Sequence, residues 1–301
     1  MTGRGQGSHL QSGAGLLGPD LAARIERLLG GAIRSATPVA GGYTPALRLL
    51  CATERGRFFV KVGATPVTAG YVRREIQVYN RVSGAFMPDL VGRDDRPDEP
   101  ILAIEDLSMH RWPPPWDEAA VERVLVQAEA MHRTPAPLEP FAAVHGGRVP
   151  GWHVVAADPG AFLSLGMADG TWLEVALPAL MAHEARCPTE GRDLTHWDLR
   201  SDNICLAPGR AVFVDWNLAC LSNGRLDLGF WLPSLAFEGG PKPEAILPDA
   251  PEVAAWVSGF FAARAGLPEI PDAPRVRLVQ RQQLSTALPW AARALGLPPP
   301  S

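Results

Sequence analysis

The spacing of hydrophobic and polar positions changes at about residue 107. Before that point, most apolar residues lie in short runs between turn residues, which predicts strands in 38–53, in R-F-F-V-K-V after a turn at 54–56, and in I-L-A-I-E-D-L. Two segments have helical spacing instead, namely 21–29, with Asp20 as its N-cap, and 68–83. The polar run G-R-D-D-R-P-D-E-P is predicted to be a loop.

After residue 107 the spacing is mainly helical. Helices are predicted over 116–132, with Asp117 as the N-cap, and over 173–185, 252–265 and 275–295. Between them, 195–217 reads as a polar cluster, a strand, a turn, a strand and a second polar cluster. The pattern therefore predicts an α+β protein with a β-rich lobe over 19–107 and a larger, mainly helical lobe over 108–301.

The N-terminal residues and the apolar runs indicate neither a membrane-spanning protein nor a secreted one. Residues 1–18 are rich in Gly and Ser and are expected to be a disordered tail outside the fold. No apolar run has membrane-spanning length, and the N-terminus lacks the apolar core of a signal peptide. We therefore expect a cytoplasmic protein.

The charge indicates which kinds of partner to expect, and the cysteine spacing indicates the state of the thiols. The net charge of −4 gives no indication of nucleic acid or an anionic membrane. There are 13 basic and 11 acidic side chains up to residue 107, and 15 and 21 after it. The acidic second part suits a cationic small substrate, although a solvated surface explains it equally well. The four cysteines have no paired spacing, so buried free thiols are expected.

The two polar clusters contain the candidate catalytic and metal-binding residues. In H-W-D-L-R-S-D-N, His196, Asp198 and Asn203 have the spacing of a kinase catalytic loop. Asp215, in V-D-W-N, takes the place of the acid that holds the metal in such a site. Asp198 is predicted to accept or orient the proton of an acceptor hydroxyl. Asn203 and Asp215 are predicted magnesium ligands, because hard divalent cations prefer oxygen ligands. His196 is predicted to brace the loop.

Such a loop requires a lysine from the small lobe. The chain has 26 Arg but only two Lys, and Lys61 lies in the strand R-F-F-V-K-V. Fourteen residues later, Glu75 lies in the predicted helix 68–83, within reach of an ion pair with Lys61. Since Arg and Lys are not interchangeable at a compact phosphate contact, this lysine indicates a nucleotide site.

Together these residues resemble the aminoglycoside phosphotransferase and choline-kinase-like family. The matching stretches are G-G-Y-T-P-A-L-R, F-V-K-V, Glu75, I-E-D-L, H-W-D-L-R-S-D-N and V-D-W-N, followed by L-D-L, over about 36–230. The resemblance implies a two-lobed protein-kinase-like fold, with a small antiparallel β-rich lobe carrying one helix. It also implies Mg²⁺ as cofactor and ATP or GTP as phosphate donor.

The resemblance further assigns roles to individual residues. It makes Asp198 the catalytic base and Asp227 a structural acid that braces the catalytic loop. The residues expected to bind the nucleotide are Gly42, Tyr43, Thr44, Lys61, Glu75, Glu105 and Leu107. Phosphate contacts are expected from the glycine loop and base contacts from the backbone of I-E-D-L.

The sequence departs from the family pattern at three places. Trp197 stands where the family commonly has Gly, Asn217 stands where an acid is frequent, and the glycine loop reads G-G-Y-T-P rather than G-x-G-x-x-G. Candidate acceptor-binding residues are Trp197, Asp202, Trp231 and Glu238. For the last three, the alternatives are an ion pair of Asp202 with Arg200, a core position for Trp231, and a solvated loop at Glu238.

The sequence thus favours a kinase that phosphorylates a hydroxyl of a small molecule, and the acidic second part suits a cationic one. The resemblance favours an antibiotic acceptor, such as an aminoglycoside or a related natural product, which would confer resistance. Two rivals stay open: a metabolic kinase for choline, homoserine, a sugar or another small alcohol, and a pseudokinase that binds nucleotide without turnover.

Overall fold

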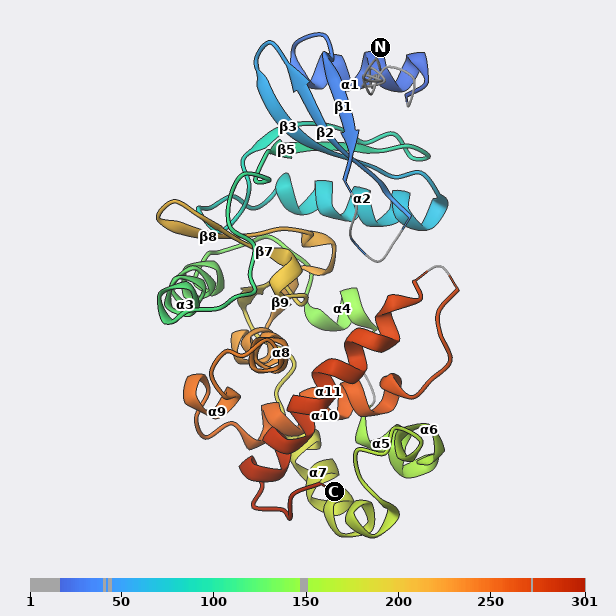
Figure 1. Cartoon of the computed structure of the whole chain (residues 1–301), viewed down its shortest axis with the longest axis vertical. Helices are drawn as coiled ribbons and strands as arrows, with labels where there is room; N and C mark the ends of the chain where they lie inside the picture. The colour runs from blue at the N-terminus through green and yellow to red at the C-terminus, as the bar shows by residue number, and fades with distance from the viewer. Residues whose placement is uncertain (1–16, 40–41, 43–44, 147–150, 272, 301) are drawn as a thin grey trace, which may run out of the picture. The chain divides into compact units, whose positions relative to one another are not determined.

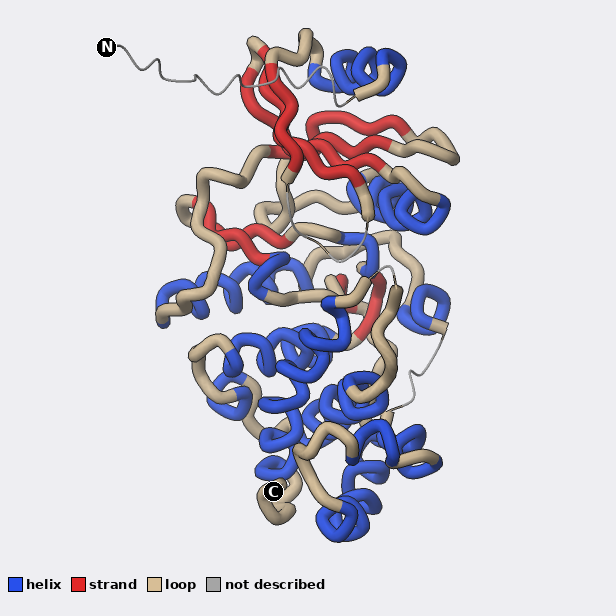
Figure 2. The backbone as a smooth tube through the Cα atoms, turned by 45° about the vertical axis from the view of Figure 1, so that its right-hand side comes forward, coloured by secondary structure: helices blue, strands red, loops and turns tan. Residues whose placement is uncertain are grey.

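The computed structural model describes residues 17–39, 42, 45–146, 151–271 and 273–300 (Figure 1). The chain folds into two compact units. The smaller comprises the described part of Met1–Gly41 together with Pro45–Ile76 and Asp89–Met109, and the larger comprises Gly42, Gln77–Pro88 and the described part of His110–Ser301. Figure 2 shows a strand-rich part and a mainly helical part, so the α+β class is confirmed. The expected tail lies almost entirely outside the described residues.

A five-stranded antiparallel sheet forms the smaller unit. Its strands are β1 (Ser35–Pro38), β2 (Leu47–Thr53), β3 (Gly56–Val62), β4 (Leu90–Asp94) and β5 (Ile101–Glu105), in the order β1-β2-β3-β5-β4. The turn between β2 and β3 lies where predicted, with Thr53 paired to Gly56. Alternate residues of β2, including Leu49 and Cys51, point into the core because successive side chains of a strand face opposite sides.

The sequence misplaced two strands of this sheet. The first was expected to begin at Pro38, but β1 ends there. The polar run 92–100 was expected to be a loop, but its first three residues belong to β4. Both are short edge strands with few fully buried positions, so they lack the apolar alternation that identifies a strand in a sequence.

Two helices begin in the small unit, in the two segments whose spacing predicted them, whereas the resemblance implied one. The helix α1 (Pro19–Leu29) begins at Pro19 with Gly18 as its N-cap, so Asp20 lies in the first turn and the predicted cap was wrong. Its buried Arg24 forms ion pairs with Asp94 at 2.7 Å and with Glu99 at 2.6 Å. The helix α2 (Pro66–Tyr79) has its last three residues, from Gln77, in a segment assigned to the larger unit, and it ends four residues before the predicted boundary.

Helices dominate the larger unit. The predicted ones are present as α3 (Glu118–His132), α7 (Gly170–Arg186), α10 (Pro251–Ala265) and α11 (Arg275–Ala294), and the Asp117 side chain caps α3 by accepting from the Ala120 N–H at 2.7 Å. The others are α4 (Phe141–His145), α5 (Trp152–Ala157), α6 (Gly160–Leu163), α8 (Gly224–Phe237) and α9 (Pro243–Ile246).

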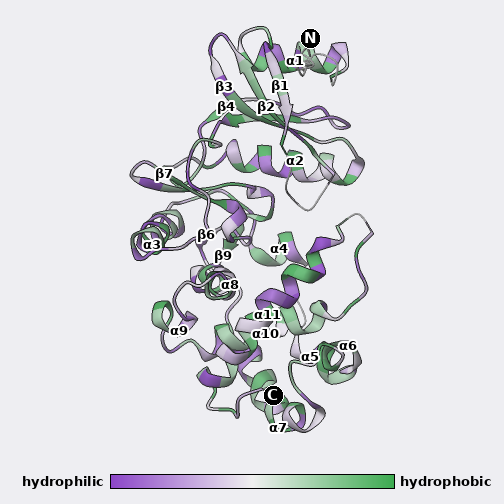
Figure 3. Cartoon of the chain, in the orientation of Figure 1, coloured by the Kyte–Doolittle hydropathy of each residue, from purple (hydrophilic) through white to green (hydrophobic). Residues whose placement is uncertain are grey.

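The core of the larger unit includes α8 and α10, which are buried around nearly their whole circumference. Both are drawn largely in the hydrophobic colours of Figure 3. All four cysteines are free and buried, as expected, and burial raises the pKa of the Cys51 thiol to about 11. Among the described residues, no helix has the length and apolar content needed to cross a membrane.

Two short antiparallel pairs support the polar clusters of 195–217. The first joins β6 (Asp193–Thr195) to β9 (Cys220–Ser222), and the second joins β7 (Ile204–Ala207) to β8 (Arg210–Phe213). The second pair is the predicted hairpin, and Gly209 in its turn has φ +74°, a conformation that glycine adopts without steric cost. The strands β6 to β8 therefore fix both ends of the loop that contains Asp198 and Asn203.

Candidate active site

The loop 196–203 is anchored through its backbone by one buried acid. Asp227 lies in the first turn of α8 and has no exposed surface. Its carboxylate accepts hydrogen bonds from the N–H of His196 at 2.9 Å and of Trp197 at 2.7 Å. His132, at the end of α3, contacts the same carboxylate at 3.1 Å through Nε2. A buried carboxylate held by several donors fixes the backbone just before Asp198.

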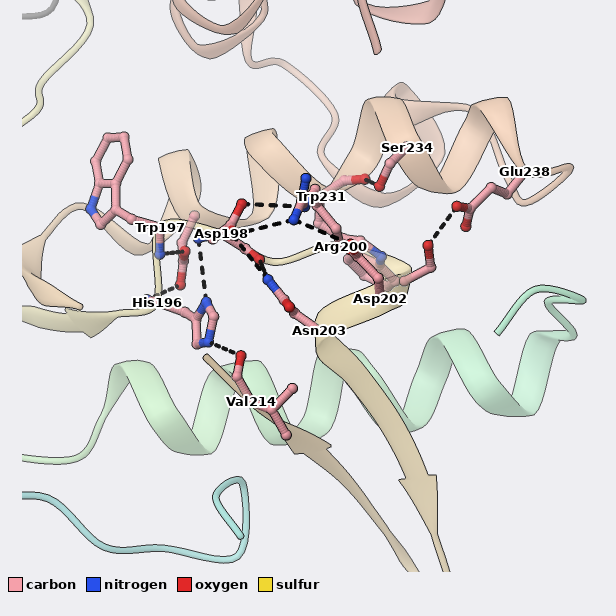
Figure 4. A network of polar contacts seen from close by, with 12 residues as sticks. His196, Trp197, Asp198, Arg200, Asp202, Asn203, Val214, Trp231, Ser234 and Glu238 are labelled. Carbon is pink, nitrogen blue, oxygen red and sulfur yellow. Dashed lines mark hydrogen bonds and ion pairs between the residues drawn. The ribbon is translucent and has the colours of Figure 1, made fainter. Parts of the chain in front are cut away.

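His196 is a fixed, neutral part of this loop. The side chain is fully buried and packs edge-on against Trp216. Its Nε2 lies 3.0 Å from the Val214 carbonyl and therefore donates, while Nδ1 accepts from the Asp198 N–H at 3.3 Å (Figure 4). Burial lowers the pKa of the imidazole. The geometry is that of a residue that positions its neighbours rather than one that exchanges protons.

Asp198 and Asn203 are in direct contact. The amide Nδ2 of Asn203 donates to the carboxylate of Asp198 at 3.0 Å and to its backbone carbonyl at 2.8 Å (Figure 4). Asp198 retains 29 % exposure of its side chain, so an incoming hydroxyl can reach it. Burial, reinforced by the negative charges of Asp215 and Asp202, raises the pKa of Asp198 to about 6, although Arg200 opposes the shift. A carboxylate with such a pKa is well suited to accept a proton.

Arg200 links two acids of the same loop. Its guanidinium lies 3.2 Å from Oδ1 of Asp198 and 3.3 Å from Oδ2 of Asp202. The internal ion pair that was one alternative for Asp202 is therefore present, and Asp202 itself is exposed. This arrangement places a positive charge beside the carboxylate that would receive the proton.

Asp215 suits a metal ligand in two respects. It has a left-handed backbone, with φ +69° and ψ +59°, and its side chain does not cap the short helix Trp216–Leu218 that follows. Its negative charge raises the pKa of Asp198, so two carboxylates lie within electrostatic range of each other. A cation would stabilise such a pair, and backbone strain of this kind is typical of functional sites.

The donor set of Asn203 and Asp215 fits magnesium bound to phosphates. The amide nitrogen of Asn203 is used by Asp198, which leaves the amide oxygen as its metal-binding atom. Within the described residues, no group of three or more His, Cys, Asp or Glu could hold a metal ion without other ligands. Magnesium in phosphoryl-transfer sites commonly has one or two protein carboxylates, the remaining ligands being water and phosphate.

Trp197, one of the departures from the family pattern, has an unusual backbone conformation. Its φ of +65° is the left-handed conformation that glycine adopts readily, which agrees with the glycine common at this position. The indole is 8 % exposed, stacks on Phe141 at 4.6 Å and contacts Trp256 at 5.7 Å. In Figure 4 it points away from the Asp198–Asn203 pair. The side chain therefore belongs mainly to an aromatic cluster and offers little surface to an acceptor.

The other two acceptor candidates have partners inside the chain. Trp231 has no exposed surface and packs on Trp116 at 5.6 Å, which is a core position. Glu238 accepts hydrogen bonds from Ser201 at 2.5 Å and from Trp116 at 2.7 Å. The roles of Ser201 and Trp116 and the contact of His132 with Asp227 were not predicted, because the partners are distant along the chain.

In the smaller unit, the structure contains the expected Lys61–Glu75 ion pair. The Lys61 Nζ lies 2.8 Å from the Glu75 carboxylate, and their side chains are 8 % and 2 % exposed. Lys61 lies on β3 and Glu75 on α2. A buried ion pair needs precise geometry to offset its desolvation, so it fixes the ammonium group of Lys61 at one position.

Of the remaining candidate nucleotide-binding residues, the structure describes Gly42, Glu105 and Leu107. Gly42 has φ +72°, which glycine adopts without strain, whereas Tyr43 and Thr44 lie outside the described residues. The backbone N–H of Glu105 already donates to the Asp89 carbonyl at 2.9 Å, and its carboxylate accepts from the Asp89 N–H at 3.2 Å. The Leu107 side chain is buried.

We predict that removing one member of the buried ion pair destabilises the protein more than removing both. Glu75→Leu leaves a buried ammonium, so it is expected to lower the free energy of unfolding by about 3–5 kcal/mol, whereas Lys61→Met with Glu75→Leu is expected to cost much less. Urea unfolding of both variants and the wild type measures this. A double variant less stable than Glu75→Leu would contradict the interpretation.

Comparison with known proteins identifies the relatives. The model of the phosphotransferase enzyme family matches residues 35–279. No curated protein matches this sequence. Similar solved structures include a thermostable mutant of the aminoglycoside phosphotransferase APH(4)-Ia with ADP and hygromycin B, which is 16% identical with a TM-score of 0.54 and 92% and 98% of the two chains covered.

Two further solved structures are similar to this chain. The spectinomycin phosphotransferase APH(9)-Ia, in complex with ADP and spectinomycin, is 11% identical with a TM-score of 0.60, and 91% of this chain and 97% of that chain are covered. The choline kinase LicA from Streptococcus pneumoniae is 13% identical with a TM-score of 0.55 and coverages of 92% and 96%. At such identities these likenesses show the fold, and they bear out its kinase-like architecture.

Proposed function

Because this chain belongs to the phosphotransferase enzyme family, as its sequence resemblance predicted, we propose that it transfers the γ-phosphate of a nucleoside triphosphate to a hydroxyl of a small molecule. ATP is the proposed donor, with GTP as the alternative, and the cytoplasm is the proposed location. The ADP complexes of the APH(4)-Ia mutant and of APH(9)-Ia support a nucleotide donor.

Donor binding is proposed for the residues that the sequence analysis singled out. Lys61, fixed by Glu75, would contact phosphate oxygens, and Asn203 and Asp215 would hold Mg²⁺. When bound, the cation would neutralise charge on the phosphates. Gly42, Tyr43 and Thr44 would approach the phosphates, and the backbone around Leu107 would contact the base.

The acceptor would react at Asp198. The acceptor hydroxyl would donate its proton to the Asp198 carboxylate as its oxygen bonds to the γ-phosphorus, while the bond from that phosphorus to the bridging oxygen breaks and the nucleoside diphosphate leaves. Asn203 keeps the carboxylate in one orientation, and Arg200 stabilises its ionised form. The Asp198–Asn203 contact within a loop pinned by Asp227 is the observation that carries this proposal.

For the acceptor, we propose an antibiotic of the aminoglycoside class or a related natural product, which phosphorylation would inactivate. The structural likeness to phosphotransferases with hygromycin B and spectinomycin, and the acidic composition after residue 107, support this class. The likeness to a choline kinase supports the second candidate, a metabolic kinase for a small alcohol.

An acceptor panel tests the proposal. The purified protein is incubated with γ-labelled ATP or GTP, Mg²⁺ and, separately, aminoglycosides, other hydroxylated antibiotics, choline, homoserine and sugars. Label is expected on an antibiotic. Transfer to a primary metabolite alone would establish the metabolic alternative, and nucleotide binding without transfer or hydrolysis would favour the pseudokinase.

A further inference from the structure

Glu238, at the end of α8, is hydrogen-bonded to two distant segments of the larger unit. Its Oε1 accepts from the Ser201 hydroxyl at 2.5 Å, and its Oε2 accepts from the Trp116 indole N–H at 2.7 Å. In Figure 4 the Glu238 side chain points back toward the loop that carries Arg200 and Asp202. Both of these donors, a hydroxyl and an indole N–H, are neutral. The carboxylate therefore joins two segments rather than balancing a positive charge.

Glu238 lies at the end of α8 where a negative charge destabilises the helix. It is the C-cap residue of α8, where the helix dipole is negative and where an acid is unfavourable. Asp227, in the first turn of the same helix, lies at the favourable end. A carboxylate at the negative end must therefore gain its stabilisation from its hydrogen-bond donors, and those donors are Ser201 and Trp116.

Ser201 begins the turn that carries Asn203. The residues Ser201–Asn203 form one 3₁₀ turn, and the Asn203 N–H donates to the Arg200 carbonyl at 2.9 Å. Because a turn of three residues has little internal freedom, holding Ser201 also restricts Asn203. The amide of Asn203 in turn fixes the Asp198 carboxylate through a contact of 3.0 Å.

The helix α8 consequently contacts the loop at both ends. Asp227 holds the backbone of His196 and Trp197, and Glu238, eleven residues further along the helix, holds Ser201. A helical segment of that length spans roughly 16 Å. Both contacts thus come from one helix, and the part of the loop between them contains Asp198.

We propose that Glu238 is a positioning residue of the catalytic loop: by joining Ser201 to Trp116, it fixes the turn from which Asn203 meets Asp198 and the metal. This inference rests on the proposed function. It replaces the expectation that Glu238 binds the acceptor, because both of its oxygens are engaged by donors of the chain itself.

Variants of each partner test the inference. Glu238→Ala and Ser201→Ala are each expected to lower kcat by roughly 10–100-fold and to weaken binding of Mg²⁺ with a non-hydrolysable ATP analogue, with the KM of the acceptor unchanged. The kcat of the double variant is expected to be no lower than that of the more impaired single variant, because both changes break the same contact. Glu129→Ala, on the exposed face of α3, serves as a matched control and should behave as wild type.

Hydrogen exchange of the free protein gives a readout independent of activity. The peptide that contains residues 200–204 is expected to exchange faster in Glu238→Ala and Ser201→Ala than in wild type and Glu129→Ala. Trp116→Phe, which removes the second donor but keeps an aromatic ring, should show a smaller increase of the same kind. Thermal unfolding is recorded alongside, so that a variant that fails to fold is recognised, and Ser201→Ala is the mildest change.

Two results would overturn the inference. One is unchanged exchange of 200–204 in both Glu238→Ala and Ser201→Ala. The other is a raised acceptor KM with unchanged kcat in Glu238→Ala and no effect of Ser201→Ala, which would identify Glu238 as an acceptor-binding residue. Failure of the proposed function differs from both, because the wild type itself would then transfer no phosphate to any acceptor, while the exchange measurement would still report the contact.

Discussion

Replacing Asp198 with alanine is expected to lower turnover roughly 10²–10⁴-fold while binding of the Mg²⁺–nucleotide survives. The carboxylate is the partly exposed acid of a loop whose backbone is fixed by Asp227. Burial raises its pKa to about 6, so it can both lose and accept a proton near neutral pH. Removing it takes away the proton acceptor but leaves the proposed metal ligands in the sequence.

A second substitution separates the proton-accepting role from a structural one. Asp198→Asn preserves the shape of the side chain and an oxygen to accept from Asn203, but the amide cannot accept the hydroxyl proton. It is therefore expected to lose nearly as much turnover as Asp198→Ala. Asp158→Ala, which changes an exposed acid after α5, is the control and should retain wild-type turnover.

Steady-state transfer of labelled phosphate measures kcat, and calorimetric titration with an ATP analogue measures binding. Turnover close to the wild type in Asp198→Asn would show that this carboxylate is not the proton acceptor. A loss of nucleotide binding equal to the loss of turnover would show instead that its role is structural.

Asp215→Ala is expected to abolish the magnesium dependence of nucleotide binding. Asp215 would supply a metal ligand with a full negative charge, and its side chain does not cap the turn after it. Losing that ligand should weaken binding of the Mg²⁺–nucleotide by more than the roughly 10–100-fold typical of partners outside the coordination sphere. The affinity measured in EDTA should be nearly unchanged.

The backbone of Asp215 requires its own control. Alanine at a left-handed position affects the local conformation as well as the charge, so a loss of binding alone is ambiguous. Asp249 is another aspartate with a positive φ, of +49°, and it lies in an exposed segment before α10. Asp249→Ala should leave nucleotide binding unchanged. Magnesium-dependent binding of wild-type strength in Asp215→Ala would exclude Asp215 as a ligand.

The features that the sequence predicted correctly are local or strongly periodic. The cap of α3 by Asp117, the hairpin of β7 and β8, and the four long helices each follow from neighbouring residues. The Lys61–Glu75 pair joins a strand to the next helix, fourteen residues along, so the predicted elements were enough to bring the two together. The spacing from His196 to Asn203 identified a loop that the structure does fold into a compact, hydrogen-bonded unit.

The features that the sequence missed depend on packing between distant segments. The helix α8 is buried nearly all round, so it has no amphipathic period, and the sequence analysis predicted no helix over 224–237. The partners of Glu238 are 37 and 122 residues away along the chain. For the same reason, Trp231 looked available for an acceptor although Trp116 covers it. At Trp197 the sequence showed an unusual residue, and its left-handed backbone appears only in three dimensions.

A crystal structure with Mg²⁺ and a non-hydrolysable ATP analogue tests the central claim most directly. We predict that oxygen atoms of Asn203 and Asp215 and of the phosphates surround the metal, and that the Lys61 ammonium contacts a phosphate oxygen. A nucleotide bound with none of these three side chains in contact with its phosphates or its metal would contradict the account.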